Sequence, residues 1–510
     1  MIIAIILMYL ALVLFVGTMG HRLFRRTGED YFVASRSIGP FILLMSLFGT
    51  NMTSVAILGA SGEAYHEGIG VFGQLASASA LIIPSVFFFV GTRVWSLGKQ
   101  HGYITQAQYF RQRWNSDILG LLLFLVLGTL MIPYLLVGVM GSGITLHQIT
   151  NNQIPEWVGA LLVCVVIMAY VTYGGMRSTA WVNTLQTLVF MSFGFIAFIV
   201  ITKKMGGLAN ALGTVAENNP ELLMRGDKIK PLQFLTYTCI PLSVGMFPHM
   251  FMHWLTAKRA ESFRYPLMFY PMCIAAVWVP SVLLGILGSI DFPNLKGPAA
   301  NSVLINVIGK YSPDFLAGML AAGVLAAIMS SLDSQVLSLG SMFTHDIVRH
   351  YGFHDKMSDK QQVLVGRLFV AGILAICFVL SLVSNRSIFK LGVWSFTGFA
   401  SLFPIVAAAL FWKRSTKYGA IAAIVSVAVT WTYFFILGSE DPGYTIGGTG
   451  VMPVAVMLAV SAATMIIVSL MTKPPDEATL QKFFATDGCI ASDKALRESE
   501  NVQRPIIHTN

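Results

Sequence analysis

Long apolar runs separated by short polar stretches dominate the 510-residue chain. Runs of about 18 or more apolar residues are typical of transmembrane helices, so the pattern predicts an all-α polytopic membrane protein. Thirteen spans are expected, with approximate limits 1–20, 40–63, 71–95, 118–145, 157–174, 181–204, 232–256, 266–290, 314–343, 364–384, 391–412, 417–438 and 451–471. The first run has no basic residue before it, which favours a retained helix over a cleavable signal peptide.

Two of these spans carry polar or helix-breaking residues in their middle. Residues 46–54 of the second span read Ser-Leu-Phe-Gly-Thr-Asn-Met-Thr-Ser, and residues 239–249 of the seventh contain two prolines around a glycine. Backbone groups freed by a break inside a bilayer must line a cavity or bind something. Interrupted helices at matching positions in two halves are typical of inverted-repeat transporters. The alternative is packing, because Gly and Pro are common in membrane helices.

The ninth span carries a polar face in its centre. On a helix, Ser330, Asp333 and Ser334 lie at i, i+3 and i+4, and Ser331 lies beside them. Hydroxyl and carbonyl oxygens suit a hard monovalent cation, and a carboxyl group within the membrane is a functional candidate. The alternative is a serine patch that hydrogen-bonds neighbouring helices.

Other polar residues within the spans are weaker candidates for a solute cavity or gate. His249 and His253 are one turn apart in the seventh span, but no third residue completes a metal site. The candidates for the cavity or gate are Asn51, Thr53, Gln74, Ser243 and His249. We expect no metal beyond a monovalent cation.

Composition and charge narrow the class of protein. Hydrophobic residues make up 55% and charged residues 11%, and the mean hydropathy is +0.71. Ordinary soluble domains have about 25% charged residues. The composition therefore excludes a cytosolic enzyme, a disordered scaffold and a nucleic-acid binder, although the net charge is +9.

The lysines and arginines predict an orientation in the membrane. With the N-terminus outside, 19 fall in predicted inside segments, nine in outside segments and five in the C-terminal tail. Cytoplasmic loops are enriched in these residues, so we expect the N-terminus outside and the C-terminus in the cytoplasm of a cell membrane.

The sequence offers little support for covalent chemistry. We find no HExxH, no GxSxG and no paired carboxylates in the membrane, so we expect no enzyme activity and no organic cofactor. The cysteines have no metal spacing and no secreted-type pattern, and we interpret them as packing residues; they are Cys164, Cys239, Cys273, Cys377 and Cys489.

Four sequence elements in the same order resemble the sodium/solute symporters, a family that includes sugar, proline, pantothenate, monocarboxylate, choline and sialic-acid carriers. The resemblance covers roughly residues 30–415. The elements are Ser35-Arg36-Ser37-Ile38-Gly39, residues 48–53, residues 173–177 with 181–186, and residues 326–334 followed by 343–347.

The resemblance implies a LeuT-type fold, in which two five-helix inverted repeats follow one extra N-terminal helix. It also implies one sodium site. By similarity, the ligands are the backbone carbonyls of Gly49, Met52 and Ala327 and the hydroxyl groups of Ser330 and Ser331.

Two departures from the family pattern concern the second ion and the solute. Many members have an aspartate where this chain has Asn183, whereas the ninth span here carries Asp333. A second ion or proton site would then combine Asp333, Ser334 and Asn183. Sugar carriers have a glutamine where this chain has Ala56 and a tyrosine gate where it has His249. A carboxylate, vitamin or amino-acid-like solute is therefore favoured over a sugar.

The sequence as a whole predicts a sodium-coupled symporter that imports a small organic solute by alternating access. Its expected partners are sodium, the solute and the lipid bilayer, with no nucleic acid; the sequence does not indicate the oligomeric state. The predicted divisions are 1–39, a first repeat at 40–204, an outer loop at 205–231, a second repeat at 232–412, two peripheral helices at 413–472 and a polar tail at 473–510.

Two alternatives keep the fold and change the function. A proton cycling on Asp333, alone or with His249, would replace sodium as the coupling ion. A transporter-like sensor would bind solute without transporting it, but a 38-residue tail is short for a signalling domain.

Overall fold

The computed structural model describes residues 1–22, 33–225, 228–352, 359–438 and 444–484. Within these residues the regular elements are helices, apart from one isolated bridge between Ile38 and Ala257. Ten helices in the described part are long and apolar enough to cross a membrane, or eleven if one bent pair counts as a single span. The predicted all-α polytopic architecture is confirmed.

The elements of the first half begin with an extra helix and continue through a bent span. They are α1 (Ile2–Arg22), η1 (Ala34–Arg36), α3 (Pro40–Asn51), η2 (Val55–Gly59), α4 (Ala60–Glu67), α5 (Gly70–Phe72), η3 (Gly73–Ser77), α6 (Ala78–Val86), η4 (Phe87–Gly91), α7 (Thr92–His101), α8 (Gln106–Arg113), α9 (Asp117–Ile149) and α10 (Glu156–Lys204). The elements α5 to α7 follow one another without a gap and form the third predicted span.

The second half starts after two short helices, α11 (Leu208–Asn218) and η5 (Pro220–Leu223), which occupy the predicted outer loop. It contains α12 (Pro231–Tyr237), η6 (Ile240–Gly245), α13 (Pro248–Leu255), η7 (Ala260–Phe263), α14 (Arg264–Asp291), η8 (Gly297–Ser302), α15 (Val303–Tyr311), α16 (Asp314–Met342), η9 (Phe343–Arg349), α17 (Asp359–Val383), α18 (Ile388–Ser401) and α19 (Phe403–Phe411). The chain ends with α20 (Lys417–Leu437), η11 (Ile446–Gly448), α21 (Pro453–Met471) and α22 (Glu477–Phe484).

Two predicted spans are shorter or more interrupted than expected. The span predicted at 157–174 is a 17-residue apolar helix, which Gly175 separates from the rest of α10. The backbone of Gly175 has φ 57°, a left-handed conformation that favours glycine. The span predicted at 232–256 is divided into α12, η6 and α13, because Pro241 and Pro248 interrupt the helical hydrogen bonds.

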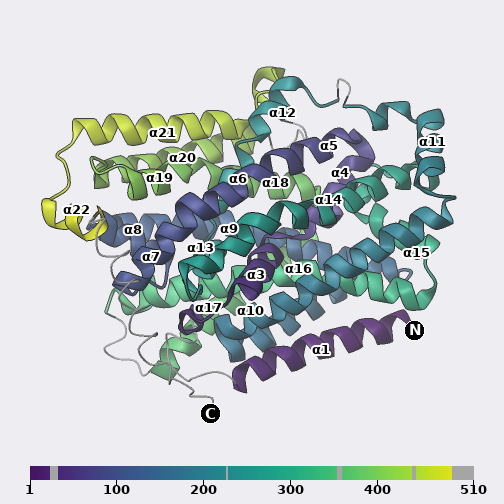
Figure 1. Ribbon diagram of the computed structural model, residues 1–510, viewed down its shortest axis with the longest axis horizontal. Coiled ribbons are helices and arrows are strands. Elements are labelled where there is room, and N and C mark those ends of the chain that lie inside the picture. Colours follow the sequence, from purple (N-terminus) through teal and green to yellow (C-terminus); the bar gives the residue numbers. More distant parts are fainter. Residues whose placement is uncertain (23–32, 226–227, 353–358, 439–443, 485–510) are drawn as a thin grey trace, which may run out of the picture.

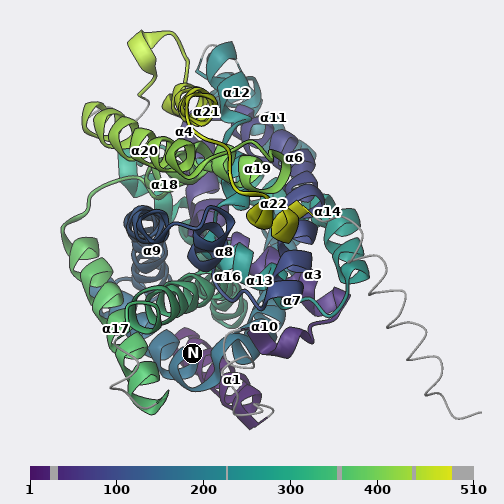
Figure 2. The same cartoon turned by 90° about the vertical axis from the view of Figure 1, so that its left-hand side faces the viewer.

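Helix α16 forms the centre of the bundle. Figure 2 shows it surrounded by α3, α9, α10 and α13, whereas α1, α17 and α20 lie at the periphery. In the apolar window of α16, 83% of the residues are buried, against 22% for α17 and α20. The polar residues of α16 are therefore removed from both lipid and water.

The two ends of the bundle are distinct. Figure 1 shows residue 1 and α11 at one end and α22 at the other. At the α22 end, Phe483 is buried, with its ring centroid 6.3 Å from that of Tyr103 and 5.9 Å from that of Tyr109. At the start of α3, Arg36 donates hydrogen bonds to the carbonyls of Tyr103 (2.8 Å) and Leu255 (3.3 Å). These contacts join the segment before α3 to the end of α13.

The cysteines of the described chain are free thiols. Cys164, Cys273 and Cys377 are buried and Cys239 is half-buried. Their burial agrees with packing roles, and Cys489 lies outside the described residues.

Candidate functional site

The second span breaks where the sequence predicted. Helix α3 ends at Asn51, Met52 has an extended backbone (φ −87°, ψ 97°), and helical structure resumes before η2, at an angle of 62°. The Thr53 hydroxyl accepts a hydrogen bond from Val55 N (3.0 Å), which caps the start of the second segment. The last carbonyls of α3 and the first N–H groups of η2 therefore meet in the interior of the bundle.

The break lies against the polar face of α16. The Ser330 hydroxyl oxygen is 2.9 Å from the Gly49 carbonyl and 2.9 Å from the Ala327 carbonyl. A hydroxyl group has one proton to donate, so it satisfies only one of the two carbonyls at a time. Gly49, Ala327 and Ser330 thus place three oxygen ligands together in a fully buried position.

The other two predicted sodium ligands lie next to this group. Met52 is 1% exposed and follows α3 by one residue. The Ser331 hydroxyl donates to the Ile328 carbonyl of its own helix (3.0 Å). A rotation of that side chain would be needed before its oxygen served a cation bound to α3.

Helix α10 packs closely against α3 near the break, on the side away from α16. A Cβ atom on Gly49 would lie 2.2 Å from the Thr187 hydroxyl oxygen and 3.3 Å from the Asn183 carbonyl oxygen. Thr187 in turn donates to the Met45 carbonyl of α3 (2.9 Å). Only glycine permits this spacing, and α3 is held between α10 and α16.

A second polar cluster surrounds Asp333, about one turn from Ser330. Tyr170 donates to one carboxylate oxygen of Asp333 (2.8 Å) and Ser334 to the other (3.0 Å). Asn183 donates from its side-chain nitrogen to the Ser334 hydroxyl (2.8 Å). The three residues predicted as the second ion site are therefore in contact. In the described chain no lysine, arginine or histidine nitrogen lies within 4 Å of the Asp333 carboxylate.

His253 connects the two clusters. One ring nitrogen is 3.0 Å from the Ser46 hydroxyl of α3, and the other is 3.2 Å from the Ser334 hydroxyl of α16. Sequence reasoning treated His253 only as a neighbour of His249 and did not single out Tyr170. The position of His253 four residues after His249 was the available signal, whereas no pattern marked Tyr170.

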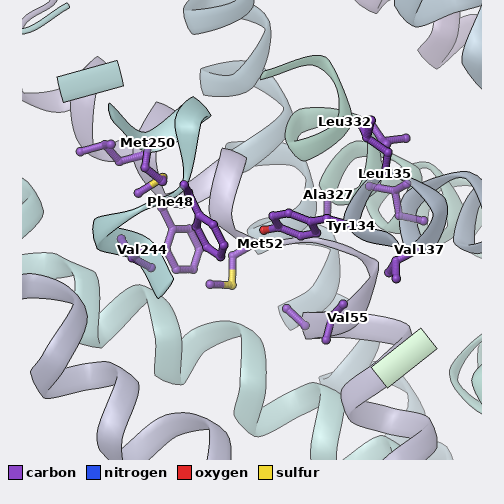
Figure 3. Close-up of a cluster of buried hydrophobic side chains, with 14 of the residues drawn as sticks. Phe48, Met52, Val55, Tyr134, Leu135, Val137, Val244, Met250, Ala327 and Leu332 are labelled. Atoms are coloured by element: carbon purple, nitrogen blue, oxygen red, sulfur yellow. The ribbon is translucent and has the colours of Figure 1, made fainter. Parts of the chain in front are cut away.

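The predicted gate residue His249 lies in a buried aromatic cluster. Its ring centroid is 5.1 Å from that of Phe247 and 5.7 Å from that of Tyr134, and Phe396 packs on Tyr134 at 4.9 Å. Neither ring nitrogen of His249 has a hydrogen-bond partner among the described residues. Buried polar atoms without partners are rare in proteins. Figure 3 shows that Tyr134 points toward the side of the break on which Met52 lies.

The remaining predicted cavity residues are dispersed. Asn51 donates to the Tyr270 hydroxyl (2.7 Å), and the Ser243 carbonyl accepts from the Met246 and Phe247 backbone N–H groups. Gln74 lies elsewhere, in a cavity lined by α4, α12 and α18. His, Cys, Asp and Glu side chains of the described chain form no group of three suited to a metal ion.

Comparison with known proteins identifies the family of the chain. The model of the sodium:solute symporter family matches residues 31–426. The osmoregulated proline transporter OpuE of Bacillus subtilis is 26% identical over 90% of this chain and 93% of its own length. The sodium/proline symporter of Escherichia coli is 24% identical (93% and 94%), and its sodium/pantothenate symporter is 24% identical (82% and 88%).

Solved structures share the fold. A substrate-bound, outward-open sodium-coupled sialic acid symporter superposes with a TM-score of 0.76 at 18% identity, covering 93% of this chain and 98% of that one. A nucleobase-cation-symport-1 family transporter in a closed conformation gives 0.57 at 15% identity, with 89% and 97% covered. Both neighbours have the LeuT-type fold that the sequence predicted.

Proposed function

The chain belongs to the sodium:solute symporter family and is a sodium-coupled solute symporter rather than an enzyme, and on that premise we propose that the coupling sodium binds where the break in α3 meets α16. The main support for this proposal is the position of the Ser330 hydroxyl oxygen, which lies 2.9 Å from both the Gly49 and the Ala327 carbonyls. Carbonyls at the end of an unwound helix are typical sodium ligands in broken-helix transporters. The Met52 carbonyl and the Ser331 hydroxyl complete the set of five.

Sodium at this position would link two elements that must move relative to each other. Helix α3 is one half of a broken span, and α16 forms the centre of the bundle. A cation shared by the two favours the conformation in which they are in contact. Coupling between ion and solute is reciprocal, so the solute raises sodium affinity by the factor by which sodium raises solute affinity.

We propose that Asp333, Ser334 and Asn183 form a second cation site. The carboxylate is fully buried and accepts hydrogen bonds from Tyr170 and Ser334, but it has no cationic partner among the described residues. A buried carboxylate of this kind requires a cation or a proton. The second candidate function, proton-coupled transport through Asp333, rests on the same observation.

We propose that the solute carries a carboxylate group and binds between the break in α3 and the aromatic cluster around His249. Proline and pantothenate, the solutes named for the relatives, are both carboxylates. The N-terminal ends of η2 and α13 face the interior, and helix N-termini favour anions. The His249 ring nitrogens, which have no partner among the described residues, supply neutral groups for hydrogen bonds, with the Tyr134 hydroxyl beside them.

The division into two repeats, 40–204 and 232–412, and the orientation with the N-terminus outside a cell membrane remain part of the proposal. The charge bias of lysine and arginine supports the orientation. The location of residue 1 and α22 at opposite ends of the bundle is consistent with it.

The test is uptake by the purified protein reconstituted in liposomes, with labelled L-proline and pantothenate as probes. An inward sodium gradient should drive accumulation of at least one probe. Ser330→Ala should raise the sodium concentration for half-maximal uptake. Ser338→Ala is the matched control, because its buried hydroxyl donates only to its own helix. Uptake that does not depend on sodium, or an unchanged sodium requirement in Ser330→Ala, would contradict the proposal.

A further inference from the structure

A cavity of about 500 Å³ lies between the ends of three helices, at the end of the bundle that the predicted topology places outside. Its walls come from the last turns of α9, the first turn of α10, the segment η8, and the end of α17 with the residues after it. Figure 2 shows α9 beside α17, and both pack against α10. The residues of the proposed ion sites and of the aromatic cluster around His249 do not line this cavity.

A buried amide group in the wall of the cavity has an unused donor. Asn301 in η8 is 3% exposed, and its side-chain nitrogen has no hydrogen-bond partner among the described residues. Buried polar atoms without a partner are rare, because the cost of removing them from water is not repaid. The Asn301 nitrogen therefore indicates a position for an acceptor that a ligand supplies.

Two opposite charges line the same cavity. Arg386 follows α17 and is half-buried, with its guanidinium carbon 5.1 Å from the centroid of the Phe435 ring. Glu156 is the first residue of α10 and is exposed. Within the part of the chain that the structure describes, no ion pair within 4 Å joins these two charges. The cavity thus offers a cation and an anion to one ligand.

The apolar side of the cavity continues into the exposed surface of the predicted spans. Leu382 and Trp157 line the cavity and are 54% and 52% exposed. Leu161 and Val165 follow Trp157 at four-residue spacing, on one face of α10, and are also exposed. Tryptophan is enriched where a bilayer meets water, so the cavity lies at that level. A ligand that fills the cavity and covers this face needs a polar head and an apolar chain.

We propose that the cavity binds the headgroup of a membrane phospholipid that carries both a phosphate and a primary ammonium group. The phosphate would accept hydrogen bonds from Arg386 and Asn301, and a guanidinium group is well suited to phosphate. The ammonium group would face Glu156, and an acyl chain would lie along Leu161 and Val165. The volume is within the range of about 300–1,000 Å³ that is usual for small-molecule sites.

The lipid would also stabilise a segment that touches the broken span. A Cβ atom on Gly62 of α4 would lie 2.9 Å from the carbonyl oxygen of Ala300, the neighbour of Asn301 in η8. Segment η8 is therefore held between α4 on one side and the cavity on the other. A headgroup bound to Asn301 should slow hydrogen exchange of η8.

The test is thermal unfolding of the purified full-length protein, stripped of lipid in detergent, with short-chain lipids added back. The probes are the dioctanoyl forms of phosphatidylethanolamine, phosphatidylcholine and phosphatidylglycerol, and glycerophosphoethanolamine, which has the same headgroup without chains. Phosphatidylethanolamine should raise the unfolding temperature most. The quaternary ammonium of phosphatidylcholine cannot donate a hydrogen bond to Glu156, and phosphatidylglycerol has no cation. Glycerophosphoethanolamine should give a small shift or none.

Substitutions assign the binding to the cavity. Arg386→Gln should raise the phosphatidylethanolamine concentration for half-maximal stabilisation about tenfold and should abolish the slower exchange of η8 at the original concentration. Arg386→Lys keeps the charge and should lose less. Glu156→Gln should remove the preference for phosphatidylethanolamine over phosphatidylglycerol.

Two residues of the predicted outer loop provide matched controls outside the cavity. Arg225 also stacks on a phenylalanine ring, with its guanidinium carbon 5.7 Å from the centroid of Phe234, and Glu217 is exposed in α11. Arg225→Gln and Glu217→Gln should respond to each lipid as the unmodified protein does.

Three results would overturn the proposal. The first is equal stabilisation by all three phospholipids. The second is stabilisation by phosphatidylethanolamine that is unchanged in both Arg386→Gln and Glu156→Gln. The third is glycerophosphoethanolamine that is as effective as the lipid, which would make the ligand a soluble phosphodiester.

Discussion

Replacing Gly49 with alanine tests whether the junction of α3, α10 and α16 holds the coupling ion. The added Cβ would lie 2.2 Å from the Thr187 hydroxyl oxygen. An ordinary contact begins near 3.4 Å, so the two groups must separate by about 1.2 Å. Helix α3 cannot move away freely, because its Gly49 carbonyl already lies 2.9 Å from Ser330 on the opposite side.

The expected effects on stability and on the ion site are of similar size. Overpacking costs roughly 1–3 kcal/mol, and alanine recovers about 1 kcal/mol of helix propensity relative to glycine, which leaves a net loss of roughly 0–2 kcal/mol. A displacement near 1 Å is large for an ion-binding geometry. We expect the sodium concentration for half-maximal uptake to rise roughly tenfold, equivalent to about 1.4 kcal/mol.

The assay is a sodium titration of uptake in liposomes with two comparison variants. Gly194→Ala is the matched control, because a Cβ there meets no atom within 4 Å. Adding Thr187→Ala to Gly49→Ala leaves the nearest contacts at 3.3 Å and 3.6 Å and should recover most of the sodium affinity. If Gly49→Ala has the sodium dependence of the unmodified protein, the assignment of the ion to this junction is wrong.

Three further substitutions address the remaining elements of the account. Ser331→Ala should weaken sodium activation of uptake, and an unchanged titration would remove Ser331 from the ligand set. Asp333→Asn should lower the steepness of the sodium titration to that of about one sodium per cycle. An unaltered steepness would contradict a second sodium site. Loss of sodium-free uptake driven by a pH gradient would instead show that Asp333 carries a proton. Phe483→Ala removes a buried ring that packs on Tyr103, worth about 1.5–3 kcal/mol, and should speed hydrogen exchange of α22 while the sodium dependence stays unchanged. Slow exchange of α22 in that variant would show that the ring does not hold the helix.

The sequence predicts the membrane spans well because an apolar run of sufficient length has few alternatives to a transmembrane helix. It also predicts the break near Met52, where small polar residues interrupt the run. The seventh span is harder, because its prolines divide it into pieces too short to qualify as one helix. Its existence as a broken element was nevertheless visible from Pro241 and Pro248.

The site is less completely predictable than the fold. Periodicity places Ser330, Asp333 and Ser334 on one face of α16, and the structure confirms that shared face. Periodicity within one helix does not show which residues of other helices meet that face. The contacts of Tyr170 and His253 depend on how α10 and α13 pack against α16, and so they appear only in three dimensions.

The position of Gln74 also could not be predicted from the sequence alone. A polar residue in an apolar span predicts a cavity, but not which cavity. The structure places Gln74 beside Glu63 and Lys390 in a cavity lined by α4, α12 and α18, away from the break in α3. Lys390 is 316 residues further along the chain, and no local pattern links two such positions.

The most direct test of the central claim is cation-specific stabilisation of the purified protein. The unfolding temperature is measured in sodium, potassium and choline chloride at fixed ionic strength. A ligand at 100 times its Kd stabilises the native state by about 2.7 kcal/mol. The account predicts a shift with sodium alone that is smaller in Ser330→Ala and unchanged in Ser338→Ala. Equal unfolding temperatures in all three salts, or a sodium shift of undiminished size in Ser330→Ala, would contradict it.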